Sequence, residues 1–173
     1  MADTPHSPVV FDLAEEAATA RLAGRVAALA EPRDVISLSG DLGSGKTVFA
    51  RAFINARTET PEEVPSPTFT LVQGYEFPDP KGAIPVYHFD LYRIEDESEL
   101  EELGLDDAFA DGISLIEWPD RLGGRMNSLL AGNRLDVVLS QGQTPEQRRA
   151  ELSGHGSWHA RLKALAEKES GDV

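Results

Sequence analysis

One stretch of eight residues carries the residue types that bind phosphate. It reads Gly-Asp-Leu-Gly-Ser-Gly-Lys-Thr and fits the pattern G-x-x-x-x-G-K-[ST]. Glycines permit close backbone approach, so that successive N–H groups can surround an anion, while the lysine binds outer phosphates and the hydroxyl contacts Mg²⁺. We therefore predict a nucleoside triphosphate site. Its predicted contacts are Gly40, Asp41, Leu42, Gly43, Ser44, Gly45, Lys46, Thr47 and Val48.

The residues on both sides of this loop support the prediction. Val35 to Ser39 is a short β-branched run that is typical of a buried strand. After the loop, Val48, Phe49, Ala52 and Phe53 recur at helical spacing. Strand, glycine loop and helix form the setting that a phosphate loop requires.

Two acidic residues follow predicted strands and can complete the site. Glu117 ends the apolar run Ile113–Ile116, and Asp90 ends a second run, Ile84–Phe89. A phosphate loop needs such an acid to hold magnesium or to order the attacking water. Both Asp90 and Glu117 are therefore candidate catalytic residues and metal ligands, and these patterns leave open which of them contacts the metal.

Other polar and aromatic residues allow two interpretations each. His88 is a proton carrier or a hydrogen-bonded strand residue, with the second favoured. Arg93 pairs with Asp90 or reaches phosphate. Arg148 and Arg149 are phosphate sensors or surface charges, with the surface slightly favoured, and Trp118 stacks on a base or packs as an ordinary aromatic.

The remaining pattern predicts an α/β fold with a mixed central sheet, flanking helices and antiparallel pieces. Leu71–Tyr75 and Ile84–Phe89 read as a hairpin. Ser66 to Thr70 is a hydroxyl-rich loop and reads as an ordinary loop or a switch segment. Further strands are expected at 9–11, 135–139 and 147–152, and helices at 12–30, 95–103 and 158–166.

Composition places these elements in one domain. The chain has 173 residues, no cysteine and a net charge of −14. We expect an extended or disordered N-terminus at 1–8, a P-loop domain at 9–167 and a frayed tail at 168–173. No apolar run reaches membrane-spanning length, and no basic stripe suits nucleic acid. We expect a cytoplasmic protein, because it lacks cysteine and a signal-peptide pattern.

Four stretches together resemble the TsaE (YjeE) family, the small bacterial ATPase of tRNA threonylcarbamoyladenosine synthesis. They are the phosphate loop, Ser66-Pro67-Thr68-Phe69-Thr70-Leu71-Val72, His88-Phe89-Asp90-Leu91-Tyr92-Arg93 and Ile116-Glu117-Trp118-Pro119. The phosphate loop is shared by many functions, whereas the other three are specific. The resemblance covers about residues 9 to 165. Ser44 departs from the alanine that the family often has.

The resemblance implies a P-loop ATPase that uses ATP and Mg²⁺. Lys46 and Thr47 would hold the triphosphate and the metal, Glu117 would be a magnesium ligand, and Asp90 would be catalytic or order water. Thr68 would belong to a switch-like loop and take part in catalysis.

The resemblance also implies a nucleobase site and protein partners. The base would lie near Glu16 and Thr19. The partners would be TsaB and TsaD, so that tRNA is contacted only through them. Hydrolysis would reset that pair between rounds of threonylcarbamoyl transfer to the adenosine next to the anticodon, and would be weak in the isolated protein.

Two other functional classes share the loop. A small-molecule kinase is the alternative, but the acidic segment Glu95–Glu102 lacks the arginines of a kinase lid. A nucleotide-dependent binding module without meaningful hydrolysis is the other.

Overall fold

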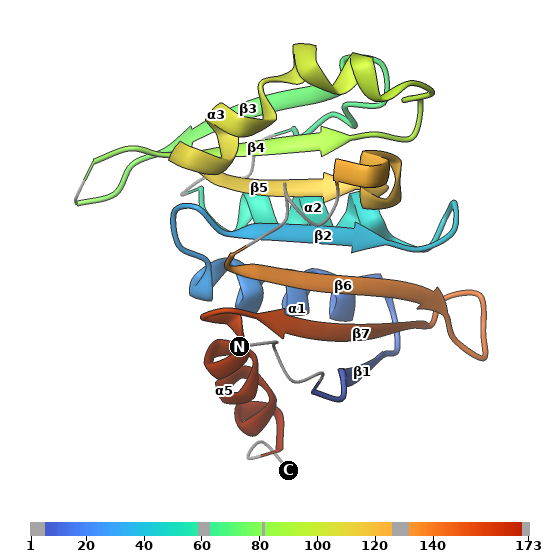
Figure 1. Cartoon of the computed structure of the whole chain (residues 1–173). Helices are drawn as coiled ribbons and strands as arrows, with labels where there is room; N and C mark the ends of the chain where they lie inside the picture. The colour runs from blue at the N-terminus through green and yellow to red at the C-terminus, as the bar shows by residue number, and fades with distance from the viewer. Residues whose placement is uncertain (1–5, 59–62, 81, 126–131, 171–173) are drawn as a thin grey trace.

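The chain folds around one seven-stranded sheet, seen in a computed structural model that describes residues 6–58, 63–80, 82–125 and 132–170. The strand order is β1-β7-β6-β2-β5-β4-β3. The four central strands, β4, β5, β2 and β6, run parallel, and antiparallel strands complete both edges (Figure 1). Strand bounds are β1 Val9–Leu13, β2 Val35–Ser39, β3 Val72–Phe77, β4 Ile84–Asp90, β5 Ile113–Glu117, β6 Arg134–Gln141 and β7 Arg148–His155. The predicted mixed α/β sheet is confirmed.

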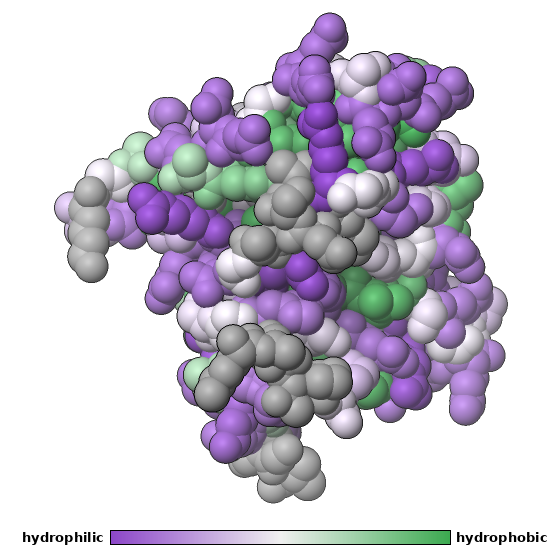
Figure 2. Space-filling view, in the orientation of Figure 1, coloured by the Kyte–Doolittle hydropathy of each residue, from purple (hydrophilic) through white to green (hydrophobic). Residues whose placement is uncertain are grey.

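Helices cover both faces of the central strands. α1 (Glu16–Leu29) and α2 (Lys46–Asn55) lie together on one face (Figure 1). The 3₁₀ helix η1 (Glu97–Leu103), α3 (Leu105–Asp111) and the 3₁₀ helix η2 (Pro119–Arg125) lie on the other. α5 (Trp158–Ser170) packs beside β7. Figure 2 shows mainly hydrophilic side chains on the face in view, as the net charge of −14 leads one to expect.

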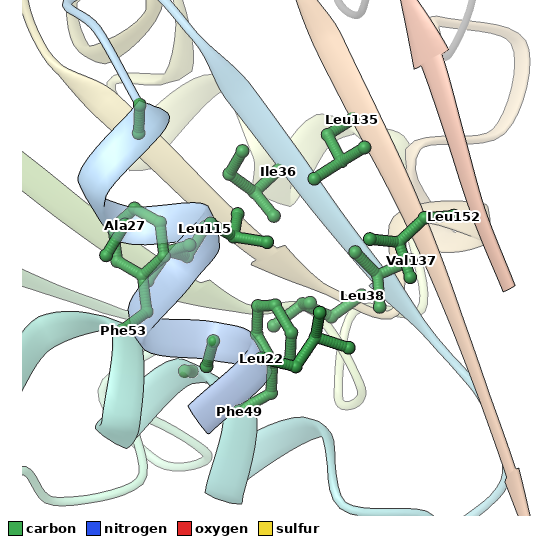
Figure 3. Packing of buried hydrophobic residues seen from close by; sticks show 14 of the residues in the cluster. Leu22, Ala27, Ile36, Leu38, Phe49, Phe53, Leu115, Leu135, Val137 and Leu152 are labelled. Atoms are coloured by element: carbon green, nitrogen blue, oxygen red, sulfur yellow. The ribbon is translucent and has the colours of Figure 1, made fainter. Parts of the chain in front are cut away.

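The main core lies between the sheet and the pair α1–α2. Leu22, Phe49 and Phe53 from the helices meet Ile36 and Leu115 from the strands (Figure 3). Since these side chains are almost fully buried, truncating either phenylalanine to alanine costs about 3–5 kcal/mol. The core thus fixes α2, and with it the loop that precedes α2, against the ends of β2 and β5.

Several predicted bounds are wrong in detail. The first strand continues to Leu13, because Asp12 and Leu13 pair with β7, and α1 therefore begins at Glu16 rather than at residue 12. Gly104 ends the acidic helix as predicted, but α3 follows at once and was not predicted.

The closing helix extends beyond its predicted end at residue 166. α5 continues to Ser170, and Arg25 of α1 forms an ion pair with Glu169 there. Residues 1–5 and 171–173, parts of the predicted N-terminal segment and tail, lie outside the described residues. Among the described residues, no helix combines the length and apolar character needed to cross a membrane.

Candidate nucleotide site

The glycine loop is a tight turn between β2 and α2. Gly40 has φ 143°, and a Cβ there would overlap the carbonyl oxygen of Leu139 in β6. Gly45, immediately before the helix, has φ 103°, which side chains rarely adopt. The first N–H groups of α2 lack partners within the helix, and its dipole adds partial positive charge. This backbone can bind an anion.

Lys46, the first residue of α2, is buried although it is basic. Its Nζ donates to the carbonyl oxygens of Gly40 at 2.6 Å and Asp41 at 2.8 Å, and lies 4.2 Å from the centroid of the Trp118 ring. Burial lowers the pKa of the ammonium, while nearby carboxylates, Glu117 first, act in the opposite direction. A phosphate oxygen is a stronger acceptor than these carbonyls, so Lys46 is suited to bind one.

Thr47 and Glu117 meet across the loop. The Thr47 hydroxyl donates to Glu117 Oε1 at 2.9 Å, and His88 Nε2 lies 2.7 Å from Oε2 of the same carboxylate. Glu117 and His88 are both almost fully buried. His88 is thus a hydrogen-bonded strand residue, the favoured interpretation.

Asp90 anchors the loop that precedes β3. Its Oδ2 accepts from the Thr68 hydroxyl at 3.0 Å, and its Oδ1 accepts from the backbone N–H of Tyr92 at 3.1 Å. The Ser66 hydroxyl lies 2.7 Å from that of Thr68. The Asp90 backbone N–H also donates to Leu71. One carboxylate therefore ties the 66–71 segment to the end of β4.

Trp118 follows Glu117 with φ 60°, an uncommon conformation for a bulky residue. Its ring packs against Tyr92 with centroids 5.0 Å apart and lines the pocket above Lys46. It is a packed aromatic, the favoured interpretation, although the ring also contributes to the wall of the pocket.

These groups enclose one pocket of about 730 Å³. Its phosphate end is lined by the loop, Thr68, Asp90 and Glu117. Its other end is lined by the start of α1 and by the β6–β7 turn. The lining residues there are Glu15, Glu16, Ala17, Thr19, Pro145, Glu146 and Arg148. The volume and the lining residues suit a nucleotide with its phosphates on the loop.

Arg148 and Arg149 have different surroundings. Arg148 Nη2 donates to the carbonyl oxygen of Gly43 at 3.1 Å, and its Nη1 donates to that of Pro145 at 2.7 Å. Arg148, the first residue of β7, thus lies half-buried at the pocket edge against the phosphate loop, and its role as a phosphate sensor stays a prediction. Arg149 is exposed and pairs with Glu151, as the slight preference for a surface role expects.

Arg93 neither pairs with Asp90 nor lines the pocket. Its guanidinium stacks 4.3 Å from the centroid of the Phe69 ring, and Phe69 is 81% exposed. The predicted pairing of Arg93 with Asp90 is wrong, because Asp90 accepts from Thr68 and from a backbone N–H instead. A contact of Arg93 with phosphate stays a prediction.

The oxygen atoms at the phosphate end fit a magnesium ion. Thr47, Asp90 and Glu117 supply hydroxyl and carboxylate oxygens, which Mg²⁺ prefers. Within the described ranges, no three acidic, histidine or cysteine residues form a metal cluster by themselves. Magnesium usually combines one or two protein carboxylates with substrate phosphates, and Asp90 and Glu117 supply two carboxylates.

The structure brings most of the predicted residues together. Leu42, Gly43, Gly45, Lys46, Thr47, Val48, Glu16, Thr19, Thr68, Asp90 and Glu117 all line the pocket. The other three do not line it: the carbonyls of Gly40 and Asp41 accept from Lys46, and the Ser44 hydroxyl lies 3.4 Å from its Nζ. Sequence reasoning missed the contribution of the β6–β7 turn. The strands predicted at 135–139 and 147–152 could have indicated it, had the first been placed beside β2.

Known proteins match both the sequence and this architecture. Residues 13–150 match the family model described as "Threonylcarbamoyl adenosine biosynthesis protein TsaE". The chain is 40% identical over 130 residues to the tRNA threonylcarbamoyladenosine biosynthesis protein TsaE of Bacillus subtilis, covering 75% of each chain. It is 41% identical over 110 residues to the protein of the same name from Aquifex aeolicus, covering 63% of this chain and 75% of the relative.

A solved structure extends the similarity to the whole fold. The crystal structure of Bacillus subtilis YdiB superposes with a TM-score of 0.70 at 27% identity, covering 98% of this chain and 99% of that one. The family match spans the phosphate loop, both strand-end carboxylates and the β6–β7 turn. The chain belongs to the TsaE family.

Proposed function

We propose that this protein is the Mg²⁺-dependent ATPase subunit of tRNA threonylcarbamoyladenosine synthesis. The observation that carries the proposal is the convergence of Lys46 and Thr47 with Glu117 and Asp90 at the phosphate end of one pocket. The relatives are named for threonylcarbamoyladenosine biosynthesis, which supplies the pathway.

The chain's own residues divide the work of hydrolysis. Loop N–H groups and Lys46 bind the phosphate oxygens, and Lys46 exchanges its carbonyl partners for them. Thr47 and Glu117 would hold Mg²⁺, which when bound neutralises charge on the phosphates. Asp90 would orient the attacking water and accept its proton, while Thr68 holds the Asp90 carboxylate in place.

The base end of the pocket would take adenine. Thr19 and Glu16 line it from α1, and Pro145 and Arg148 line it from the opposite turn. Two walls from separate elements suit a planar base between them.

The partners would be TsaB and TsaD, with tRNA held by them in the cytoplasm. A net charge of −14 disfavours direct binding of a polyanion and suits docking on a basic protein surface.

The test is ATP turnover by the chain alone and mixed with TsaB and TsaD. We expect weak release of inorganic phosphate alone, stimulation on mixing, and loss of both in Lys46→Ala. A Lys163→Ala variant, changed at an exposed lysine of α5, should behave as wild type. Failure to interact with either partner would contradict the proposal. Transfer of phosphate to a metabolite rather than to water would identify a kinase instead.

A further inference from the structure

His88 is the one buried histidine of β4, and it contacts the pocket only through another residue. It is 0% exposed, lies two residues before Asp90, and is in register with Leu115, two residues before Glu117. Its Nε2 lies 2.7 Å from Glu117 Oε2. It does not line the pocket. Any role it has in nucleotide chemistry must therefore pass through Glu117.

The Glu117 carboxylate is divided between two donors. Oε2 faces His88, and Oε1 accepts from Thr47, the residue whose hydroxyl a magnesium ion would contact. A carboxylate that is to hold a metal must be ionised and then only accepts, so in the metal-binding form His88 Nε2 is the donor. His88 Nδ1 is buried without a hydrogen-bond partner, which leaves the Glu117 contact as the polar interaction that fixes the ring.

We infer that His88 is a positioning residue for magnesium: it holds Oε2 so that Oε1 stays directed at the Thr47 hydroxyl. Outer hydrogen bonds of this kind orient a metal's carboxylate ligands, and losing one typically weakens metal affinity about 10- to 100-fold. The inference rests on the proposed function, because it requires the Mg²⁺·ATP complex.

Replacing the imidazole while keeping the fold tests this role. His88→Phe keeps a planar ring and removes the donor, His88→Leu is a second donor-free variant, and His88→Gln restores an N–H. ATP binding is titrated calorimetrically with EDTA and at increasing Mg²⁺. In both donor-free variants the Mg²⁺ concentration for half-maximal enhancement of ATP binding should rise about 10- to 100-fold. Metal-free ATP binding should change less than about twofold, because Lys46 and the loop amides are untouched, and His88→Gln should recover most of the loss.

Val86→Ala is the matched structural control. Val86 lies on the same strand and the same face as His88 and is also fully buried, but it packs in the apolar core. It should lower the unfolding temperature without changing the Mg²⁺ requirement. An equal shift in Val86→Ala and His88→Phe would overturn the inference, and so would a folded His88→Phe protein with wild-type Mg²⁺ dependence.

Two further outcomes are informative. If wild-type protein shows no Mg²⁺-dependent binding of ATP, the proposed function fails and the inference fails with it. If both donor-free variants unfold, NMR of the wild-type His88 Nε2–H decides: its resonance should shift when Mg²⁺ is added to the ATP complex. An unchanged resonance would overturn the inference.

Discussion

Two buried carboxylates lie at opposite ends of the adjacent parallel strands β2 and β5, and one has a cation as its partner whereas the other has a hydroxyl and an imidazole. Asp34 precedes β2 and is 1% exposed, and Glu117 ends β5 and is 2% exposed. Asp34 accepts two bonds from Arg161 of α5, at 2.6 and 2.9 Å, and one from the Glu31 N–H at 2.7 Å. Glu117 accepts instead from a hydroxyl and an imidazole.

The difference shows that burial alone does not mark a functional acid. Asp34 has a permanent cation in bidentate geometry, so its charge is already compensated. The ammonium nearest to Glu117 belongs to Lys46, which donates to loop carbonyls; in the part of the chain that the structure describes, it forms no ion pair. Glu117 is thus the carboxylate that can accept an exchangeable cation, whereas Asp34 fixes α5 to the sheet.

The largest expected effect comes from removing one partner of the ion pair between Asp34 and Arg161. Asp34→Ala leaves Arg161 without its carboxylate, and the free energy of unfolding should fall by about 3–5 kcal/mol. Urea unfolding measures this, with Glu167→Ala, an exposed acid of α5, as the control that should stay within about 0.5 kcal/mol. ATP binding by the folded fraction of Asp34→Ala should match wild type. A loss below about 1 kcal/mol would mean that the pair does not fix α5.

The opposite result is expected for Glu117→Gln. Stability should change by less than about 1 kcal/mol, because no fixed cation loses its partner. Phosphate release in the presence of TsaB and TsaD should fall about a hundredfold to a thousandfold, equivalent to about 3–4 kcal/mol. If nucleotide binding and turnover both stay unchanged, Glu117 is not a metal ligand. If Glu117→Gln destabilises as much as Asp34→Ala, the two carboxylates do not differ in the proposed way.

The sequence predicts the position and role of Glu117 far better than it predicts the partner of Asp34. Runs such as Val35–Leu38 and Ile113–Ile116 mark strands covered on both faces, and a phosphate loop creates the need for an acid at a strand end. Asp34 meets an arginine 127 positions away, and no local pattern reports such a pair. The same limit hid the contact of Arg148 with Gly43, 105 positions apart.

The sequence also failed to predict one short helix, α3. α3 spans seven residues, of which only Leu105 and Ala108 are buried, so its hydrophobic period is too short to stand out. The positive φ of Trp118 was not predicted either. Its backbone N–H donates to Leu38 and its ring packs on Tyr92, which are contacts between separate elements that no local pattern reports.

A third buried carboxylate, Asp90, extends the comparison, with a smaller expected effect on turnover. Asp90 resembles Glu117, since it too is held by a hydroxyl, that of Thr68, and not by a cation. Thr68→Val removes one hydrogen bond to the Asp90 carboxylate, worth about 1.5–3 kcal/mol, so turnover with TsaB and TsaD should fall about tenfold to a hundredfold. Thr70→Val, at an exposed threonine of the same loop, should leave turnover unchanged. Equal effects of the two substitutions would show that the loop as a whole matters rather than the hold on Asp90.

The smallest expected effect is on the pH dependence of stability, and it comes from Lys46, the ammonium nearest to Glu117. Burial lowers the pKa of Lys46 in the folded protein from its usual 10.5. As pH rises through the lowered pKa, folded Lys46 loses its proton while the unfolded chain keeps it until about 10.5. The unfolded state then binds more protons, so stability rises with pH in that window.

Urea unfolding between pH 8 and about 10.5 measures this contribution, because other titrating groups cancel when variants are compared with wild type. Lys46→Met, which has no charge to lose, should show a shallower rise or a steeper fall than wild type. Lys46→Arg should do the same, since its charge persists. Parallel curves for all three proteins would mean that Lys46 keeps its charge in the folded protein up to its usual pKa, so that its burial does not disfavour the ammonium.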